Sequence, residues 1–398
     1  MITLLKQALG VREIPRGSSL HGAVVDIRPL EGHGVRVTGE LIPVGSTRDV
    51  ELEPGWYEAR AWLPSGDLLT AEFQLRGDGP RTEIYLEPTT RIRHAELEGF
   101  AGSLQSSVRR PTRQADAPPS QPRRAWRLAV ASDASGDDEA HPTWRLVDGC
   151  RTRPVLEVGA DTGAVVVPVE PGQQFYAGGV WRFDFDPTGS EQRGFLGVEE
   201  DNERSLACLP VEGGGPVQAL VAGGSTPDLP ATSVALDDPL IAPMFGYLAS
   251  GDLPMAERMA HAALGALFEK IQHPIAAAAG ALILVRTERD PKDKYWHEWI
   301  DNLYREFPWL PDGAVAKTWH AIQRVRSEDD LAQVLVYADE AWRRGLPYFT
   351  VGLQLLSESL LLLQPHLPDA GRRLQIVRSA LSAADRGQAF TTLRWVVR

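Results

Sequence analysis

The sequence predicts a multidomain α+β protein, with two antiparallel β-sandwich-like domains followed by an all-α helical-hairpin bundle. Three observations predict this order. Apolar and polar residues alternate over much of 1–102, and less regularly over 126–230, which is the period of half-buried strands. From residue 237 onward, apolar positions recur every three or four residues, as in amphipathic helices. Residues 103–125 are rich in arginine and proline and poor in apolar side chains, which indicates a disordered linker.

The composition is typical of a chain with several folded domains. At ~100–200 residues per domain, 398 residues predict two to four domains, and an apolar content of 43% can supply their cores. The longest apolar run, 274–285, is too short to cross ~30 Å of hydrocarbon as a helix. The N-terminus has no long apolar stretch behind a basic start, so we expect no secretory signal and a cytoplasmic, bacterial-type protein. Only Cys150 and Cys208 are present, which excludes a disulfide scaffold.

The net charge of −12 is distributed unevenly. Residues 1–102 carry a net charge of −4 and residues 128–230 carry −11, whereas 231–398 is nearly neutral. Residues 103–127 hold six arginines against Asp116, a net charge of +5. Because nucleic-acid binders are usually basic overall, the total argues against that class.

The first domain, 1–102, is predicted to be a β-meander. Glu53-Pro54-Gly55 forms a turn between two alternating runs, because proline fixes φ and glycine allows a positive φ. The run VELEPGWYEARAWLPSG at 50–66 resembles the prealbumin-like and carboxypeptidase-regulatory-like sandwiches, in which Pro-Gly precedes an aromatic strand. The resemblance implies a fold but no activity.

The second domain, 126–230, is predicted to be β-rich and acidic. Its Glu170-Pro171-Gly172 repeats the turn of the first domain, so a duplication is one interpretation and a chance match is the other. Asp184 to Gly189 begins like a calcium loop, but the twelfth position, which must supply a bidentate glutamate, is Phe195. We therefore expect a strand end and a solvated turn there.

The third domain, 231–398, is predicted to contain six to eight helices joined by short turns. Ser327 and Asp330 indicate a capping box at a helix start, and Gly345 is expected to end that helix. Pro347 is expected to begin the next helix, which runs to Leu363. We also expect this segment to fold on its own, because its contacts are local.

The strongest enzymatic candidate is His297 with Asp301, four residues apart on one helix. They could act as a base with its orienting carboxylate, or as two metal ligands, with His320 beside them. The alternative is a surface pair on a helix that packs its tryptophans. No nucleophile, nucleotide loop or third ligand accompanies the pair, so we expect no catalytic residue, cofactor or metal. A carbohydrate-binding module using Trp56 and Trp62 is a further alternative.

The linker admits three interpretations: a passive tether, an electrostatic contact with the acidic domain or nucleic acid, and a protease-accessible switch. An arginine-directed peptidase would recognise five of its residues: Arg109, Arg110, Arg113, Arg123 and Arg124.

Three motifs of the helical domain resemble C-terminal modules of multidomain actinobacterial and myxobacterial proteins that occur beside caspase-like or trypsin-like peptidases. They are PIAAAAG at 274–280, WLPDGA at 309–314 and GLP at 345–347. The resemblance implies a partner of peptidase-based signalling or antiviral defence systems. Because no peptidase domain is recognisable, the sequence favours a non-catalytic adaptor, regulator or proteolytic substrate of such a peptidase, without a nucleic-acid or membrane partner.

Overall fold

The computed structural model describes most of the predicted elements but leaves out much of the chain between them. The residues described are 5–11, 22–30, 37–43, 47–62, 68–76, 83–88, 125–131, 142–153, 158, 164–168, 174–177, 180–185, 193–200, 203–211, 217–222, 232–236, 242–250, 256, 273–287 and 294–396. The five linker arginines and the Glu170-Pro171-Gly172 turn lie outside these ranges. No described helix is long and apolar enough to cross a membrane.

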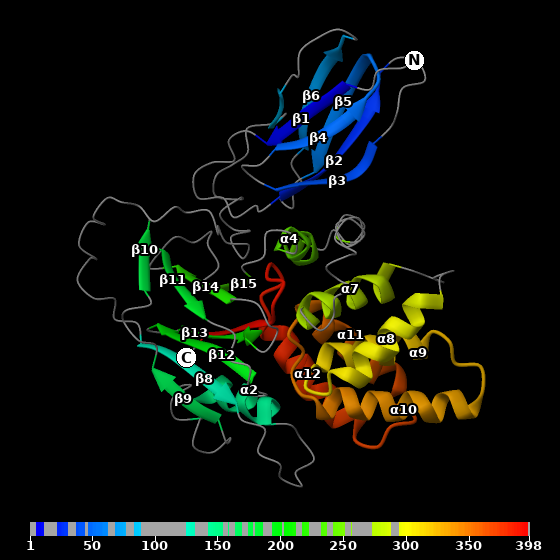
Figure 1. Ribbon diagram of the computed structural model, residues 1–398. Helices are drawn as coiled ribbons and strands as arrows, with labels where there is room; N and C mark the ends of the chain where they lie inside the picture. Colours follow the sequence, from blue (N-terminus) through cyan, green and yellow to red (C-terminus); the bar gives the residue numbers. More distant parts are fainter. Residues whose placement is uncertain are drawn as a thin grey trace.

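Seven strands form the N-terminal sheet (Figure 1). They are β1 Leu5–Val11, β2 Gly22–Pro29, β3 Val37–Pro43, β4 Thr47–Leu52, β5 Gly55–Trp62, β6 Leu68–Leu75 and β7 Glu83–Pro88. Their order is β3-β2-β5-β6-β7-β1-β4, and all neighbours are antiparallel except β1 and β7, which are parallel. The alternation predicted for β5 is confirmed: Tyr57, Ala59 and Ala61 are buried, and the Pro54-Gly55 turn separates β4 from β5.

The N-terminal sheet has its own hydrophobic core. Inward side chains from β2, β4, β5, β6 and β7 form one cluster, which includes Ile27, Leu52, Tyr57, Phe73 and Leu86. The rings of Tyr57 and Phe73 stack with centroids 5.9 Å apart. This cluster is separate from the two clusters that the remaining described residues form.

Two further sheets and the helix α2 are described in the middle of the chain, and the last described strand of the chain, β16, joins one of these sheets. The first sheet has the order β16-β13-β12-β8-β9 and the second β10-β11-β14-β15. Their bounds are β8 Ala125–Ala131, β9 Ala164–Pro168, β10 Gln174–Ala177, β11 Val180–Phe185, β12 Arg193–Glu200, β13 Glu203–Leu209, β14 Val217–Ala222, β15 Thr232–Leu236 and β16 Thr392–Val396. The helix α2 (Pro142–Thr152) was not expected in this segment. Neither strand order repeats that of the N-terminal sheet.

The C-terminal region is mostly helical. Its described helices are α4 Ala242–Ser250, α7 Pro274–Thr287, α8 Lys294–Glu306, α9 Pro311–Ile322, α10 Glu328–Arg343, α11 Thr350–Leu363 and α12 Ala370–Ala383. The capping box is confirmed, because Ser327 Oγ accepts from the Asp330 amide and the Asp330 carboxylate accepts from the Ser327 amide. Gly345 follows α10 with φ of 86°, which suits glycine.

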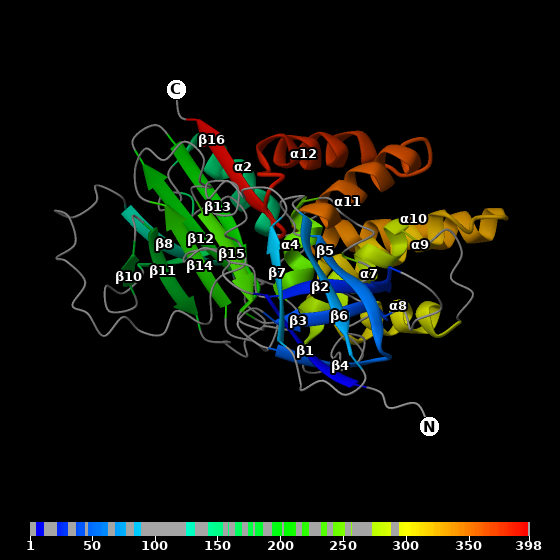
Figure 2. The same cartoon turned by 90° about the horizontal axis from the view of Figure 1, so that it is seen from above.

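The structure corrects the expectation that residues 231–398 are all α. Strand β15 pairs with β14, and β16 pairs antiparallel with β13 across nearly two hundred residues (Figure 2). One hydrophobic cluster runs from α2 and the middle sheets into α7–α9, α11 and α12. The fold is therefore mixed α+β, and its helices share a core with the two sheets.

Helix α11 begins at Thr350, three residues after the predicted start at Pro347. The intervening residues stay outside the helix because their backbone groups bond elsewhere: Phe349 forms an isolated antiparallel bridge with Phe390, and Thr391 N donates to Tyr348 O (2.7 Å).

Candidate functional site

The predicted pair His297 and Asp301 lies on α8, but each side chain has another partner. His297 Nδ1 lies 2.6 Å from Nε2 of His320 on α9, and Asp301 forms an ion pair with Lys317, also on α9. Lys317 lies over the ring of Tyr337, 4.9 Å from its centroid. The carboxylate therefore pairs with an ammonium group, and the two imidazoles pair with each other.

The imidazole of His320 is uncharged near pH 7. Burial, together with the nearby positive charge of Arg324, lowers the pKa of His320 to about 4. One ring must then donate its N–H to the other. Within the described ranges, no three His, Cys, Asp or Glu side chains gather closely enough to hold a metal ion.

The segment 345–349, between α10 and α11, has many hydrogen-bond partners and is here called the strap. Both oxygens of Asp312 on α9 accept from it: Oδ2 from the Tyr348 amide (2.7 Å) and Oδ1 from the Phe349 amide (3.2 Å). Asp312 is fully buried, and burial raises its pKa to about 7 against the opposing effect of these N–H donors. A Cβ at Gly352 would collide with this carboxylate, which explains a glycine there.

The strap also contacts the middle segment of the chain. Leu346 N donates to Thr143 Oγ1 on α2 (2.9 Å), and Leu346 O accepts from the buried guanidinium of Arg193 on β12. That guanidinium lies 4.3 Å from the ring centroid of Tyr348. Asp312 and Arg193 therefore hold the strap from the helical and the sheet side.

A stacked tryptophan pair reinforces this junction. The rings of Trp144 on α2 and Trp342 on α10 are 4.9 Å apart and nearly parallel, and Trp144 Nε1 donates to Trp342 O (3.1 Å). Both side chains are buried. Aromatic stacking and a satisfied indole N–H make this a specific contact.

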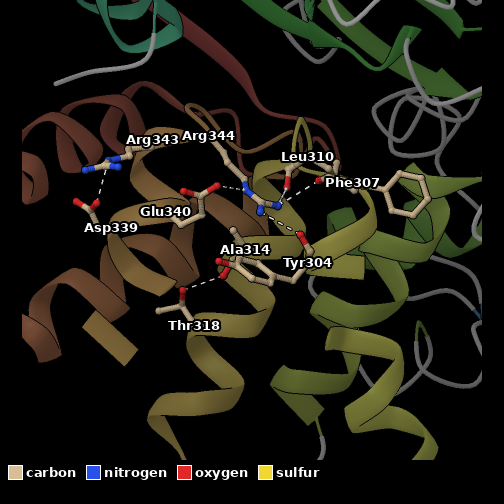
Figure 3. Close-up of polar contacts among 9 residues, drawn as sticks. All are labelled: Tyr304, Phe307, Leu310, Ala314, Thr318, Asp339, Glu340, Arg343 and Arg344. Atoms are coloured by element: carbon tan, nitrogen blue, oxygen red, sulfur yellow. Dashed lines mark hydrogen bonds and ion pairs between the residues drawn. The ribbon is translucent and has the colours of Figure 1, made fainter. Parts of the chain in front are cut away.

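Arg344 joins the C-terminal ends of α8 and α10 (Figure 3). Its guanidinium donates to Tyr304 O (3.0 Å), Phe307 O (3.1 Å) and Glu340 Oε1 (3.0 Å), and it lies over the Tyr304 ring. It therefore satisfies carbonyl groups that a helix end leaves without intrahelical partners.

The outer face of the N-terminal sheet carries a regular set of side chains, here called the outer grid. Strand register aligns three rows across β2, β5 and β6: Leu30, Trp56 and Gln74; Arg28, Glu58 and Glu72; Asp26, Arg60 and Thr70. Trp56 and Leu30 are 43% and 41% exposed. Trp62 lies on β5, but its side chain is outside the described set.

Both cysteines are buried, Cys150 on α2 and Cys208 on β13. Burial raises the pKa of Cys150 to about 12, which keeps it a thiol at neutral pH.

Sequence reasoning missed Asp312, Arg193 and Arg344. Asp312 belongs to Pro-Asp-Gly, which looks like a turn, although proline and an acidic residue also mark a helix start. No local pattern marks Arg193, because its partner Leu346 lies 153 residues away.

The span that contains α4, the strap and most of β16 has a known relative. Residues 243–394 match the family model of the Y4kD C-terminal domain. No curated protein and no solved structure matches the chain. The match to the Y4kD C-terminal domain covers less than half of the chain and supports the expectation of a helical C-terminal module. It includes Asp312, Arg344 and His320, whereas Arg193, Thr143 and Trp144 precede it.

Proposed function

We propose that this chain is a non-catalytic interaction protein: an adaptor, regulator or substrate of a caspase-like or trypsin-like peptidase in a bacterial signalling or defence system. Cleavage in the Arg-rich segment 103–125 would release the N-terminal β-domain. In this proposal that domain is a prealbumin-like sandwich in the cytoplasm.

The observation that carries the proposal is that the described residues of the N-terminal sheet share no hydrophobic cluster with those of the rest of the chain. Among the described residues, the cluster around Tyr57 and Phe73 contains side chains from β2 and β4–β7 alone, and the largest cluster joins the middle sheets to the C-terminal helices. The Arg-rich segment lies between them in the sequence. A cut there would leave each core intact. The two parts would then no longer be held at a high effective concentration by the linking chain, so they could separate.

The partners of the acidic and basic side chains support a non-catalytic role. Asp312 holds the strap, Arg344 satisfies helix ends and Asp301 pairs with Lys317. Each contact orders the fold, and each side chain is already engaged. His297 bonds to His320 and Asp301 pairs with Lys317, and these contacts favour a structural role for both side chains over a base with its orienting carboxylate.

The experiment pairs the chain with a peptidase encoded by a neighbouring gene. Co-expression should yield a fragment ending at one of five arginines, seen by intact-mass analysis: Arg109, Arg110, Arg113, Arg123 or Arg124. Changing these five to glutamine should abolish that fragment.

The matched control changes five other arginines to glutamine, all exposed in the structure: Arg145, Arg151, Arg343, Arg372 and Arg378. This control should still be cut. Cleavage elsewhere, or equal cleavage of both variants, would contradict the switch.

A further inference from the structure

The outer grid has a fixed polar centre. Both Nε and Nη2 of Arg28 lie 2.7 Å from Glu58 Oε2, and Nε of Arg60 donates to Glu58 Oε1 (2.7 Å). The Glu58 side chain is nearly buried between the two guanidinium groups. Burial opposes its ionisation, but the bonds from Arg60 and Arg28 hold its pKa below the usual value. The three side chains are therefore pre-ordered on the surface.

An apolar pair lies next to this centre. Trp56 and Leu30 face each other across β5 and β2, where Leu30 N donates to Trp56 O (2.9 Å). Both are large apolar side chains exposed to solvent, whereas the side chains on the opposite face of the same strands are buried. Their exposure is therefore not required by the core.

The charges of the outer grid exclude a strongly charged ligand. Arg28 and Arg60 are set against three carboxylates, Asp26, Glu58 and the exposed Glu72, so the grid carries a net charge of −1. A nucleic acid or another polyanion needs a surplus of positive charge, which this face does not have. A face on which positive and negative side chains nearly cancel favours a neutral ligand.

The chemistry fits a ligand that carries many hydroxyl groups. Each hydroxyl both donates and accepts. In the same row as Trp56, the grid offers the amide of Gln74. In the next row it offers the carboxylate of Glu58 and the Nη1 donor of Arg28, which the ion pair with Glu58 does not use. An exposed indole supplies a flat apolar surface. A protein partner fits this face less well, because two partly exposed apolar side chains present much less area than the ~800 Å² that each side of a standard protein interface buries.

We propose that the outer grid binds a neutral polysaccharide, whose sugar rings stack on Trp56 while their hydroxyl groups bond to Gln74, Glu58 and Arg28. This site is independent of the proposed cleavage, because its residues belong to β5, β6 and β2 with the adjoining Leu30. It would direct the N-terminal domain to a glycan, whether or not that domain is released.

The test is affinity electrophoresis of the intact chain in native gels containing soluble starch, hydroxyethyl cellulose or glycol chitin. At least one polysaccharide should retard the protein, and Trp56→Ala should weaken this binding at least about tenfold. Because Trp56 is exposed, the variant should fold normally. The matched control is Leu362→Ala, which removes an exposed apolar side chain on α11 and should bind like the unchanged protein.

Three results would overturn the proposal: no retardation in any of the gels, equal retardation of Trp56→Ala, or equal weakening by Leu362→Ala. If sedimentation shows self-association that Trp56→Ala abolishes, the grid is an interface between copies, which also overturns it.

Discussion

At the scale of single residues, two consecutive arginines have opposite environments. The Arg344 side chain is 6% exposed and bonds to three carbonyl groups and Glu340, whereas that of Arg343 is 68% exposed and pairs with Asp339 (Figure 3). We predict that Arg344→Ala lowers the free energy of unfolding by about 2–4 kcal/mol, because it leaves buried acceptors without donors. Arg343→Ala should cost less than about 1 kcal/mol. Urea unfolding of both variants measures the difference, and equal losses would contradict the assignment.

Asp312 should give the stability of the protein a pH dependence. Its pKa is raised from 3.8 to about 7, so the native state holds a proton that the unfolded chain has released. The resulting stabilisation is complete below 3.8 and is lost as the pH rises through about 7. We predict that the wild type loses stability relative to Asp312→Asn over this interval, measured by urea unfolding at several pH values.

Exposed Asp330 is the control for that experiment. Its pKa is lowered by the backbone N–H of Arg326, so its contribution has the opposite sign. Relative to Asp330→Asn, the wild type should gain stability as the pH rises. A flat difference between wild type and Asp312→Asn would show that Asp312 is not the group responsible.

At the scale of elements, β16 forms one edge of the five-stranded sheet, where it pairs with β13. Leu393 is fully buried opposite Leu206 of β13, whereas Val396, on the same strand, is 73% exposed. We predict that Leu393→Ala costs about 2–4 kcal/mol of stability through the cavity it creates, and that Val396→Ala costs less than about 0.5 kcal/mol. Thermal unfolding compares them. If both variants lose equally little stability, β16 does not pack on β13 and the core as described.

The elements that the sequence predicts well are those with local signals. Ser327 with Asp330 and Gly345 predict both ends of α10, because caps act within one turn. Helix α2 also had a local signal, namely Pro142 in the first turn followed by Trp144, Val147 and Cys150.

Long-range contacts are what the sequence does not reveal. Strand β16 is short, and its partner β13 lies far away in the chain. The start of α11 is displaced by bonds to Asp312 and Phe390, which no local propensity encodes. In the candidate site, His297 and His320 were recognised as neighbours of interest, but their direct pairing depends on how α8 packs on α9.

At the scale of the molecule, the shared core reverses the expectation that residues 231–398 fold alone. That fragment would lose Trp144, Arg193 and β13, leaving β16 without its partner strand and the strap without its contacts to Thr143 and Arg193. We predict that 231–398 alone melts without cooperativity, whereas 125–398 melts cooperatively. Differential scanning calorimetry of the two fragments measures this cooperativity. A cooperative transition of 231–398 alone would contradict the shared core.

The central claim is that one connection joins two bodies with independent cores. The most direct measurement is limited trypsin digestion of the intact chain, followed by intact-mass analysis and gel filtration under native conditions. Early cuts should fall at Arg109–Arg124, and the N-terminal piece should elute apart from a single folded piece that extends to the C-terminus. Earliest cuts elsewhere, or cleaved pieces that elute together, would contradict the account.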